Sequence, residues 1–252
     1  MTIEICKNHT GKMEKIQSIS TSVLLNPFCQ SNRKKLGSIC SHCYAENLAN
    51  MYSALAARLA RNTEVLTSGV IPWDLLPTIE TKVGEETIFR FEAFGDIINE
   101  TQLYNYYMIT RKNPFVRFSL YTKRYSLVTK FFEREDVDVP PNLTIVFSSL
   151  MLNTPIDINK LKGHGMFRKG QIKSFTVYSK DYIKKHPELK INCGARCCNT
   201  CRLCYLKNEV EEIREILKTD REATERFLAF KDPEVLAKTV EDLEEFELKF
   251  DE

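Results

Sequence analysis

Cysteines are the feature of this sequence that most constrains its fold. Five of the nine fall within twelve residues, in the run NCGARCCNTCRLCY, and three more lie in NPFCQSNRKKLGSICSHCYAE near the front. Thiols this crowded form disulfides or bind a soft metal or an iron–sulfur cluster. No apolar stretch follows a basic start, and nine is an odd number, so disulfides are the weaker interpretation. The sequence predicts a cytoplasmic protein with metal-binding cysteines.

Length and charge narrow the class of protein. A chain of 252 residues that is 43% hydrophobic can bury a sizeable core, and no run approaches the roughly 18–20 apolar residues of a membrane span. The net charge of +2 excludes a protein that binds nucleic acid by overall charge alone, but the charge is uneven. Residues 209–252 carry a net −9, whereas residues 160–190 hold nine Lys or Arg. This predicts an acidic tail and a basic front for an anionic partner, unless both are simply solvated faces.

Strand and helix patterns alternate along the chain. Strands are expected at 17–22, 87–93, 115–121, 143–148 and 173–178, and helices at 45–61, 101–111, 125–133 and 207–249. Short connections between them predict a parallel sheet with right-handed crossovers. The length favours a partial barrel, because a full eightfold barrel takes about 250 residues. We therefore expect an α/β fold: a partial (β/α) barrel over residues 1–205 with a C-terminal cysteine knot, and an acidic helical extension over 206–252.

The first cysteine group consists of Cys29, Cys40 and Cys43. The spacing of Cys40 and Cys43 lets two thiolates reach one metal centre, and three thiolates suit a 4Fe–4S cluster with one iron left open for substrate. A structural zinc site needs four ligands, so the alternative is a zinc knuckle completed by His42 or from elsewhere. Cys6 stands alone and is expected to be a small buried apolar residue.

The second cysteine group is Cys193, Cys198, Cys201 and Cys204. The first three repeat the C-x4-C-x2-C spacing of plant-type 2Fe–2S sites, and Cys204 adds a fourth ligand. Cys197 could replace Cys198, since adjacent cysteines seldom bind one centre together. The spacing alone leaves iron–sulfur and zinc open. It also leaves open whether the two cysteine groups form two sites or share one.

Six candidate binding residues lie at or just past the ends of three predicted strands: Glu92, Gly95, Asp96, Lys123, Arg124 and Ser148. In parallel β/α folds, ligands bind at the carboxyl ends of the strands. There a glycine lets a ligand approach the backbone, a carboxylate accepts from an amine or a ribose hydroxyl, and a cation holds an anionic substrate or cofactor carboxylate. The same pairs also occur as ordinary turns and surface residues.

The ordered motifs NPFC, ICSHCYAENLA, FRFEAFGD, FSLYTKR and the final Cys204-Tyr205 resemble the phage "gene product 88" family, which is similar to radical S-adenosylmethionine proteins. The resemblance runs from about Ser18 to Tyr205. It implies a phage-encoded protein in the host cytoplasm with a radical-SAM type barrel, a cluster on the first cysteine group, and S-adenosylmethionine near Gly95 and Asp96. The chain departs from the usual C-x3-C-x2-C pattern, because ten residues separate Cys29 from Cys40.

Two hypotheses of function follow. The first is an iron–sulfur enzyme with radical S-adenosylmethionine chemistry on an unknown small-molecule or macromolecular substrate. The alternative is a non-enzymatic module, held by zinc or a closed cluster, that binds nucleic acid or a host protein through its basic front. The catalytic residues are not identified by the sequence.

Overall fold

A computed structural model describes residues 2–8, 11–81, 84–134, 136–162, 165–194 and 197–217. Over these residues the chain forms a seven-stranded sheet in which each strand lies beside the next one in the sequence. The strands are β1 (Cys6–Lys7), β2 (Gln17–Ile19), β3 (Thr87–Phe91), β4 (Val116–Thr122), β5 (Leu143–Ser148), β6 (Ile172–Tyr178) and β7 (Glu212–Ile216). β1 is antiparallel to β2, and all the other neighbours are parallel. The expected α/β fold with a mostly parallel sheet is therefore confirmed.

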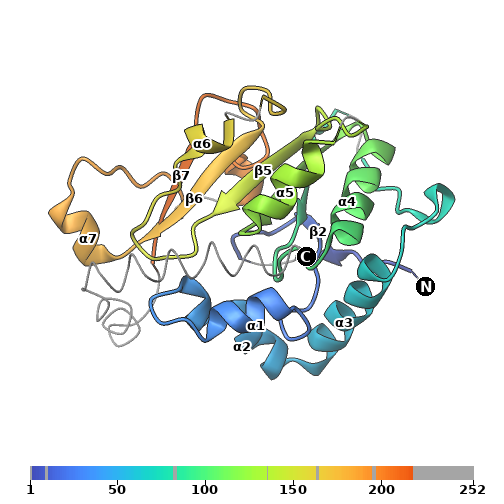
Figure 1. Cartoon of the computed structure of the whole chain (residues 1–252), viewed down its shortest axis with the longest axis horizontal. Helices are drawn as coiled ribbons and strands as arrows, with labels where there is room; N and C mark the ends of the chain where they lie inside the picture. The colour runs from blue at the N-terminus through green and yellow to red at the C-terminus, as the bar shows by residue number, and fades with distance from the viewer. Residues whose placement is uncertain are drawn as a thin grey trace.

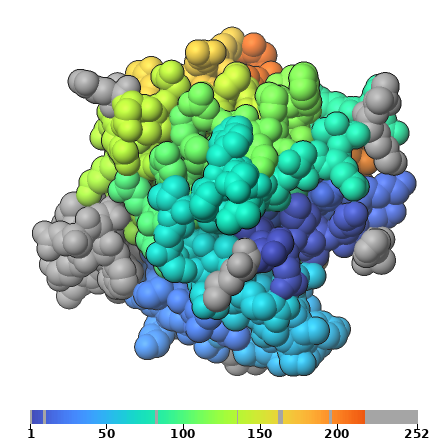
Figure 2. Space-filling view, turned by 90° about the vertical axis from the view of Figure 1, so that its right-hand side faces the viewer, coloured from blue at the N-terminus to red at the C-terminus, as the bar shows by residue number. Residues whose placement is uncertain are grey.

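Helices flank this sheet and form a separate layer at one end of it. The helices are α1 (Pro27–Arg33), η1 (Ile39–His42), α2 (Tyr44–Met51), α3 (Ser53–Thr67), η2 (Trp73–Leu75), α4 (Glu100–Lys112), α5 (Tyr125–Phe132), α6 (Ile158–Lys162), α7 (Lys180–Lys185) and α8 (Cys198–Cys201). α4 and α5 lie on the sheet, whereas α1–α3 lie below the ends toward which the strand arrows point (Figure 1). The same layer, in light blue, forms the bottom of the molecule in Figure 2.

The two faces of the sheet differ in chemistry because side chains alternate along each strand. Phe89, Phe91 and Phe118 point to the helices and join Tyr106 of α4 in the main core. The Phe91 ring stacks at 5.1 Å from Phe118 and at 4.3 Å from Tyr106, measured between centroids. The opposite face, here called the polar face, carries Arg90 and a smaller apolar cluster.

Most expected elements are confirmed, but one expected helix is broken. The strand at 143–148 coincides with β5, and the helix at 101–111 lies within α4. The helix expected over 45–61 is two helices, α2 and α3, separated by Tyr52 with φ −118° and ψ 97°. That extended backbone turns the chain between two segments that are each strong helix formers, so side-chain propensity did not reveal it.

The second error concerns the helix expected over 207–249. Glu212–Ile216 forms the edge strand β7, paired in parallel with β6. Ile213 is 1% exposed there, and its burial against the sheet outweighs the helical preference of a charged segment. The strand β7 thus lies beyond residue 205, and residues 218–252 lie outside the described part of the chain, so the expected division into two domains stays a prediction. In the described residues no helix is long and apolar enough to span a membrane.

Candidate functional site

A cavity of about 1230 Å³ lies between the polar face of the sheet, its carboxyl ends and the layer of α1 and α2. All seven cysteines expected to bind metal line it, together with five of the six polar residues expected at strand ends: Cys29, Cys40, Cys43, Cys193, Cys198, Cys201, Cys204, Glu92, Gly95, Asp96, Lys123 and Ser148. The sixth, Arg124, lies outside the lining, with its guanidinium carbon 5.1 Å from the centroid of the Phe28 ring. Two cysteine groups that are far apart in sequence thus share one cavity.

Three short helical segments position the first cysteine group. Asn26 caps α1 by accepting from the Phe28 amide at 3.0 Å, and Cys29 follows in the first turn. Ser38 caps η1, where its hydroxyl accepts from the Cys40 amide at 3.1 Å, and Cys43 directly precedes α2. Each cysteine therefore sits at a helix start, where backbone N–H groups favour negative charge. Metal binding requires the thiolate form of these cysteines.

Electrostatics join these three thiols to Lys123. Burial raises the pKa of Cys29 and of Cys40, and the other thiols raise it further, whereas the Lys123 ammonium lowers it. Burial alone would lower the pKa of Lys123, but Cys40 and Asp96 raise it above its usual value. The Lys123 ammonium thus faces thiol and carboxyl groups that carry negative charge when they are deprotonated.

His42 also lines the cavity, between Cys40 and Cys43 in sequence. In the described residues, no three His, Cys, Asp or Glu side chains are spaced so that they would hold a metal ion as they stand. The metal ligands therefore stay predictions, which rest on the donor chemistry and on the shared cavity.

Lys12 and Tyr121 contact the second cysteine group. The Lys12 ammonium donates to the Cys193 sulfur at 3.0 Å and forms an ion pair with Glu215. The Tyr121 hydroxyl donates to the Cys204 sulfur at 2.7 Å. Burial raises the pKa of the Cys204 thiol to about 12. Hydrogen bonds from an ammonium and a phenol stabilise sulfur that carries negative charge.

The adjacent Cys197 and Cys198 differ in direction. Cys198 lines the cavity, and its backbone amide donates to the Lys12 carbonyl at 2.8 Å. Cys197 precedes α8 and lies outside the lining, with its sulfur 3.8 Å from the Glu14 carbonyl oxygen. Which of the two cysteines binds metal stays a prediction.

Glu92 closes the end of β3 with a network of hydrogen bonds. Its Oε1 accepts from the Tyr106 hydroxyl at 2.5 Å and the Gln102 amide at 2.6 Å. Thr21 donates through its hydroxyl at 3.0 Å and through its backbone amide at 3.2 Å. Burial raises the pKa of Glu92 to about 7, against the opposing effect of these hydrogen bonds. Glu92 therefore ties β2, β3 and α4 together at the edge of the cavity.

Gly95 and Asp96 hold the loop that follows. A Cβ atom at Gly95 would lie 2.7 Å from the Thr21 carbonyl oxygen, so only glycine fits against β2. Asp96 Oδ1 accepts from the Thr122 hydroxyl at 2.6 Å and the Ile97 amide at 2.8 Å, and Oδ2 accepts from the Lys123 amide at 3.0 Å. The two oxygens of a carboxylate offer about four acceptor sites, so Oδ2 retains capacity for one more donor.

Sequence reasoning missed Arg90 and Lys12, which both line the cavity. Arg90 is the one charged residue in the strand sequence TIFRF, and an arginine between two buried phenylalanines is a signal that could have found it. Lys12 lies in a turn before β2, and nothing local indicates its contact with Cys193.

Comparisons with known proteins place the chain in a family. It has no significant match among the curated proteins and none among the solved structures. Residues 4–182 match the family described as Gene product 88, and this span covers α1, η1 and the strands β2–β6. No comparison bears on the further similarity to radical S-adenosylmethionine proteins, so that similarity stays a prediction. The match spans more than half of the sequence, and the chain therefore belongs to the phage gene product 88 family.

Proposed function

We propose that the chain is an iron–sulfur protein that binds a 4Fe–4S cluster through Cys29, Cys40 and Cys43 and takes S-adenosylmethionine beside it. The observation that carries the proposal is that these three cysteines line one cavity with Lys123 and Asp96 at the carboxyl ends of β3 and β4. Three soft thiol ligands leave one iron of such a cluster without a protein ligand. When bound and reduced, such a cluster supplies one electron to S-adenosylmethionine.

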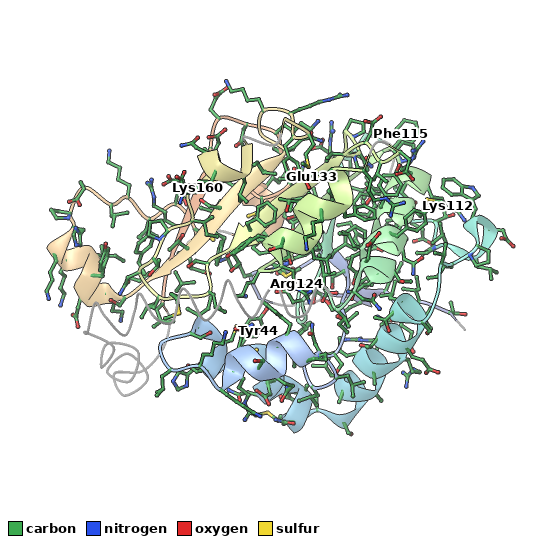
Figure 3. All side chains as sticks on the ribbon, in the orientation of Figure 1. Tyr44, Lys112, Phe115, Arg124, Glu133 and Lys160 are labelled. Carbon is green, nitrogen blue, oxygen red and sulfur yellow. The ribbon has the colours of Figure 1, made fainter. Side chains whose placement is uncertain are left out.

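The residues around the cysteines have separate roles in this proposal. Lys123 would hold the carboxylate of the cofactor. Its ammonium donates no hydrogen bond among the described residues, and it interacts only electrostatically with the neighbouring thiols and with Asp96. Asp96 would accept from an amine or a ribose hydroxyl through Oδ2. Tyr44, labelled in Figure 3 in the space between α2 and the strand ends, donates to the Ala93 carbonyl and connects α2 to the loop after β3.

The fold proposed for this function is a partial barrel. Parallel strands that follow one another in spatial order, with right-handed crossovers, place their helices on one face of the sheet. The other face is then enclosed when the sheet curves, as it does in barrels. This supports an interior site on the face that carries Arg90 and Tyr121.

The experiment that tests the proposal is anaerobic purification with counts of iron and inorganic sulfide. We expect Cys29→Ala, Cys40→Ala and Cys43→Ala each to lower both counts sharply. The matched control is Cys6→Ala, because Cys6 lies on β1 outside the lining of the cavity and is half-buried like the three test cysteines, with its sulfur 3.8 Å from Asn8 Oδ1. Stoichiometric zinc without sulfide in the wild-type protein would refute the cluster.

For the second group we propose a metal or cluster site with a mainly structural role. The group has four thiols, which is the ligand number of a closed tetrahedral zinc site; they belong to Cys193, Cys198, Cys201 and Cys204. Burial raises the pKa values of Cys198 and Cys204, and neighbouring thiols raise them further, so the four groups act on one another electrostatically. If zinc filled both groups, the non-enzymatic module that binds nucleic acid or a host protein would become the better proposal.

A further inference from the structure

Arg90 lies in the middle of β3, on the polar face of the sheet, and lines the cavity. Its guanidinium carbon is 3.7 Å from the centroid of the Tyr121 ring, on the neighbouring strand β4. A stacked guanidinium is fixed in its plane while its N–H edges remain directed outward. Arg90 is therefore held in place, and its plane is set by the ring of Tyr121.

The guanidinium of Arg90 has few acceptors. Of its five N–H donors, one meets an acceptor in the described structure, the Met13 sulfur at 3.6 Å from Nη1. Its Nε atom is buried without a hydrogen-bond partner, and no carboxylate among the described residues forms an ion pair with it. Leaving a charged donor enclosed and unpaired is costly, so an anion that enters the cavity would gain N–H donors that no acceptor among the described residues uses.

Hydroxyl groups that have no hydrogen-bond partner in the described part of the chain flank Arg90 in the sheet. Ser18 on β2 and Ser119 on β4 are the register partners of Arg90, both are 0% exposed, and both hydroxyl oxygens lack a partner among the described residues. Tyr205, which is 3% exposed and lines the cavity, has an unpartnered buried hydroxyl as well. Buried polar groups in folded proteins are nearly always hydrogen-bonded. Ser18 and Ser119 lie outside the lining of the cavity, so Arg90 and Tyr205 are the groups that indicate a missing polar partner there.

We propose that Arg90, with Tyr205 beside it, binds the oxyanion group of a small-molecule substrate, a carboxylate or a phosphate. The proposal gives the chemical class of substrate that the cavity would bind. It rests on the proposed function in one respect, which is that the reacting end of the substrate would lie near Cys29, Cys40 and Cys43. Ligand sites usually measure about 300–1,000 Å³, so the cavity of about 1230 Å³ has room for a substrate beside the cofactor.

The rival explanation is that Arg90 balances the charge of thiolates in the second cysteine group. Cys204 is the candidate that these contacts indicate, because it accepts from the hydroxyl of Tyr121, whose ring lies under the guanidinium. However, none of the described cysteines accepts a hydrogen bond from Arg90. An oxyanion would use the guanidinium fork, which matches carboxylate and phosphate geometry in a way that single sulfur atoms do not.

Isothermal titration of the anaerobically purified full-length protein with inorganic phosphate, and separately with benzoate, tests the proposal. We expect saturable binding of at least one anion, and roughly tenfold or greater weakening in Arg90→Met. The matched control is Arg117→Met, because Arg117 lies on the neighbouring strand, is ion-paired to Glu86 at 2.9 Å and does not line the cavity. Iron and inorganic sulfide are counted on every variant, so loss of the cluster and loss of the anion site are distinguishable.

The outcomes separate the alternatives. Tighter binding of phosphate assigns the substrate group as a phosphate, and tighter binding of benzoate assigns a carboxylate. If Arg90→Met does not fold, Arg90→Lys carries the test, with several-fold weakening expected because a point charge replaces a planar fork. The proposal is overturned if the wild type binds neither anion, if the folded Arg90 variants bind as tightly as the wild type, or if Arg90→Met loses metal from the second group without any effect on anion binding.

Discussion

At the scale of single residues, Glu92 combines burial with four hydrogen bonds, and burial has the larger effect on its pKa. The folded value of about 7 lies above the ordinary value of 4.5, and the neighbouring Asp96 charge contributes in the same direction. The folded protein therefore binds the Glu92 proton more tightly than the unfolded chain does. By linkage, the stability that this proton contributes is complete below about pH 4.5 and is lost as the pH rises to about 7.

Glu92→Gln should flatten this dependence. We expect the wild-type free energy of unfolding to fall by at most about 1.4 kcal/mol per pH unit through this window because of Glu92, and the Gln variant to show a shallower slope. Urea unfolding at several pH values measures both slopes. Glu100→Gln is the control, since the Glu100 side chain is 59% exposed and pairs with Arg134 on the surface. Equal slopes in the wild type and Glu92→Gln would contradict the expectation.

The residue types at the strand ends could be predicted from the sequence, but the directions in which their side chains point could not. Lys123 and Arg124 are adjacent in sequence, yet Lys123 lines the cavity and Arg124 packs against Phe28. Alternation along the chain places successive side chains on opposite sides, and a shift of one residue at the end of β4 decides which one reaches the site. Arg90 was missed because a strand pattern identifies buried phenylalanines without showing what the opposite face encloses.

At the scale of elements, α8 and the cysteines around it connect the far edge of the sheet to the turn before β2. Cys193 contacts Lys12, and the Cys198 amide donates to the Lys12 carbonyl. Strand pattern and short connections were enough to predict β2–β6, but β7 depends on pairing with β6, a long-range contact that outweighs its helix-like composition. The break at Tyr52 lies between two segments that both favour helix, so propensity does not reveal it.

Metal binding at the second group should stabilise this connection directly, because ligand binding contributes to folding free energy. We expect Cys201→Ala and Cys204→Ala to lower the free energy of unfolding by roughly 2 kcal/mol or more, or the melting temperature by about 5 °C. Thermal unfolding with metal analysis checks this. Cys197→Ala is the matched control, because its thiol points to the Glu14 carbonyl and away from the cavity. Unchanged melting and metal content in both test variants would exclude a structural role.

At the scale of the whole molecule, the parallel order of the strands explains why distant motifs meet. The carboxyl ends of β3 and β4 carry Asp96 and Lys123, and the chain after β6 returns with the second cysteine group to the same cavity. The sequence could predict both cysteine groups and the strand ends, since each has a local pattern. It could not decide whether the groups share one site, because that depends on how the sheet and the layer of α1 and α2 enclose space.

Binding of S-adenosylmethionine is the prediction that depends on this whole arrangement. If the first cysteine group holds a cluster with one open iron, the cofactor replaces a weak ligand there, and the electron paramagnetic resonance spectrum of the reduced cluster should change when it is added. Under dithionite the protein should then form 5′-deoxyadenosine. Lys123→Met should weaken the spectral response, because the cation that faces the cofactor carboxylate is lost. Lys169→Met is the control, since Lys169 is ion-paired to Glu209 on the surface. A reduced spectrum that does not respond to saturating S-adenosylmethionine would leave the cluster in a structural or electron-transfer role, and the cavity would then serve binding rather than radical chemistry.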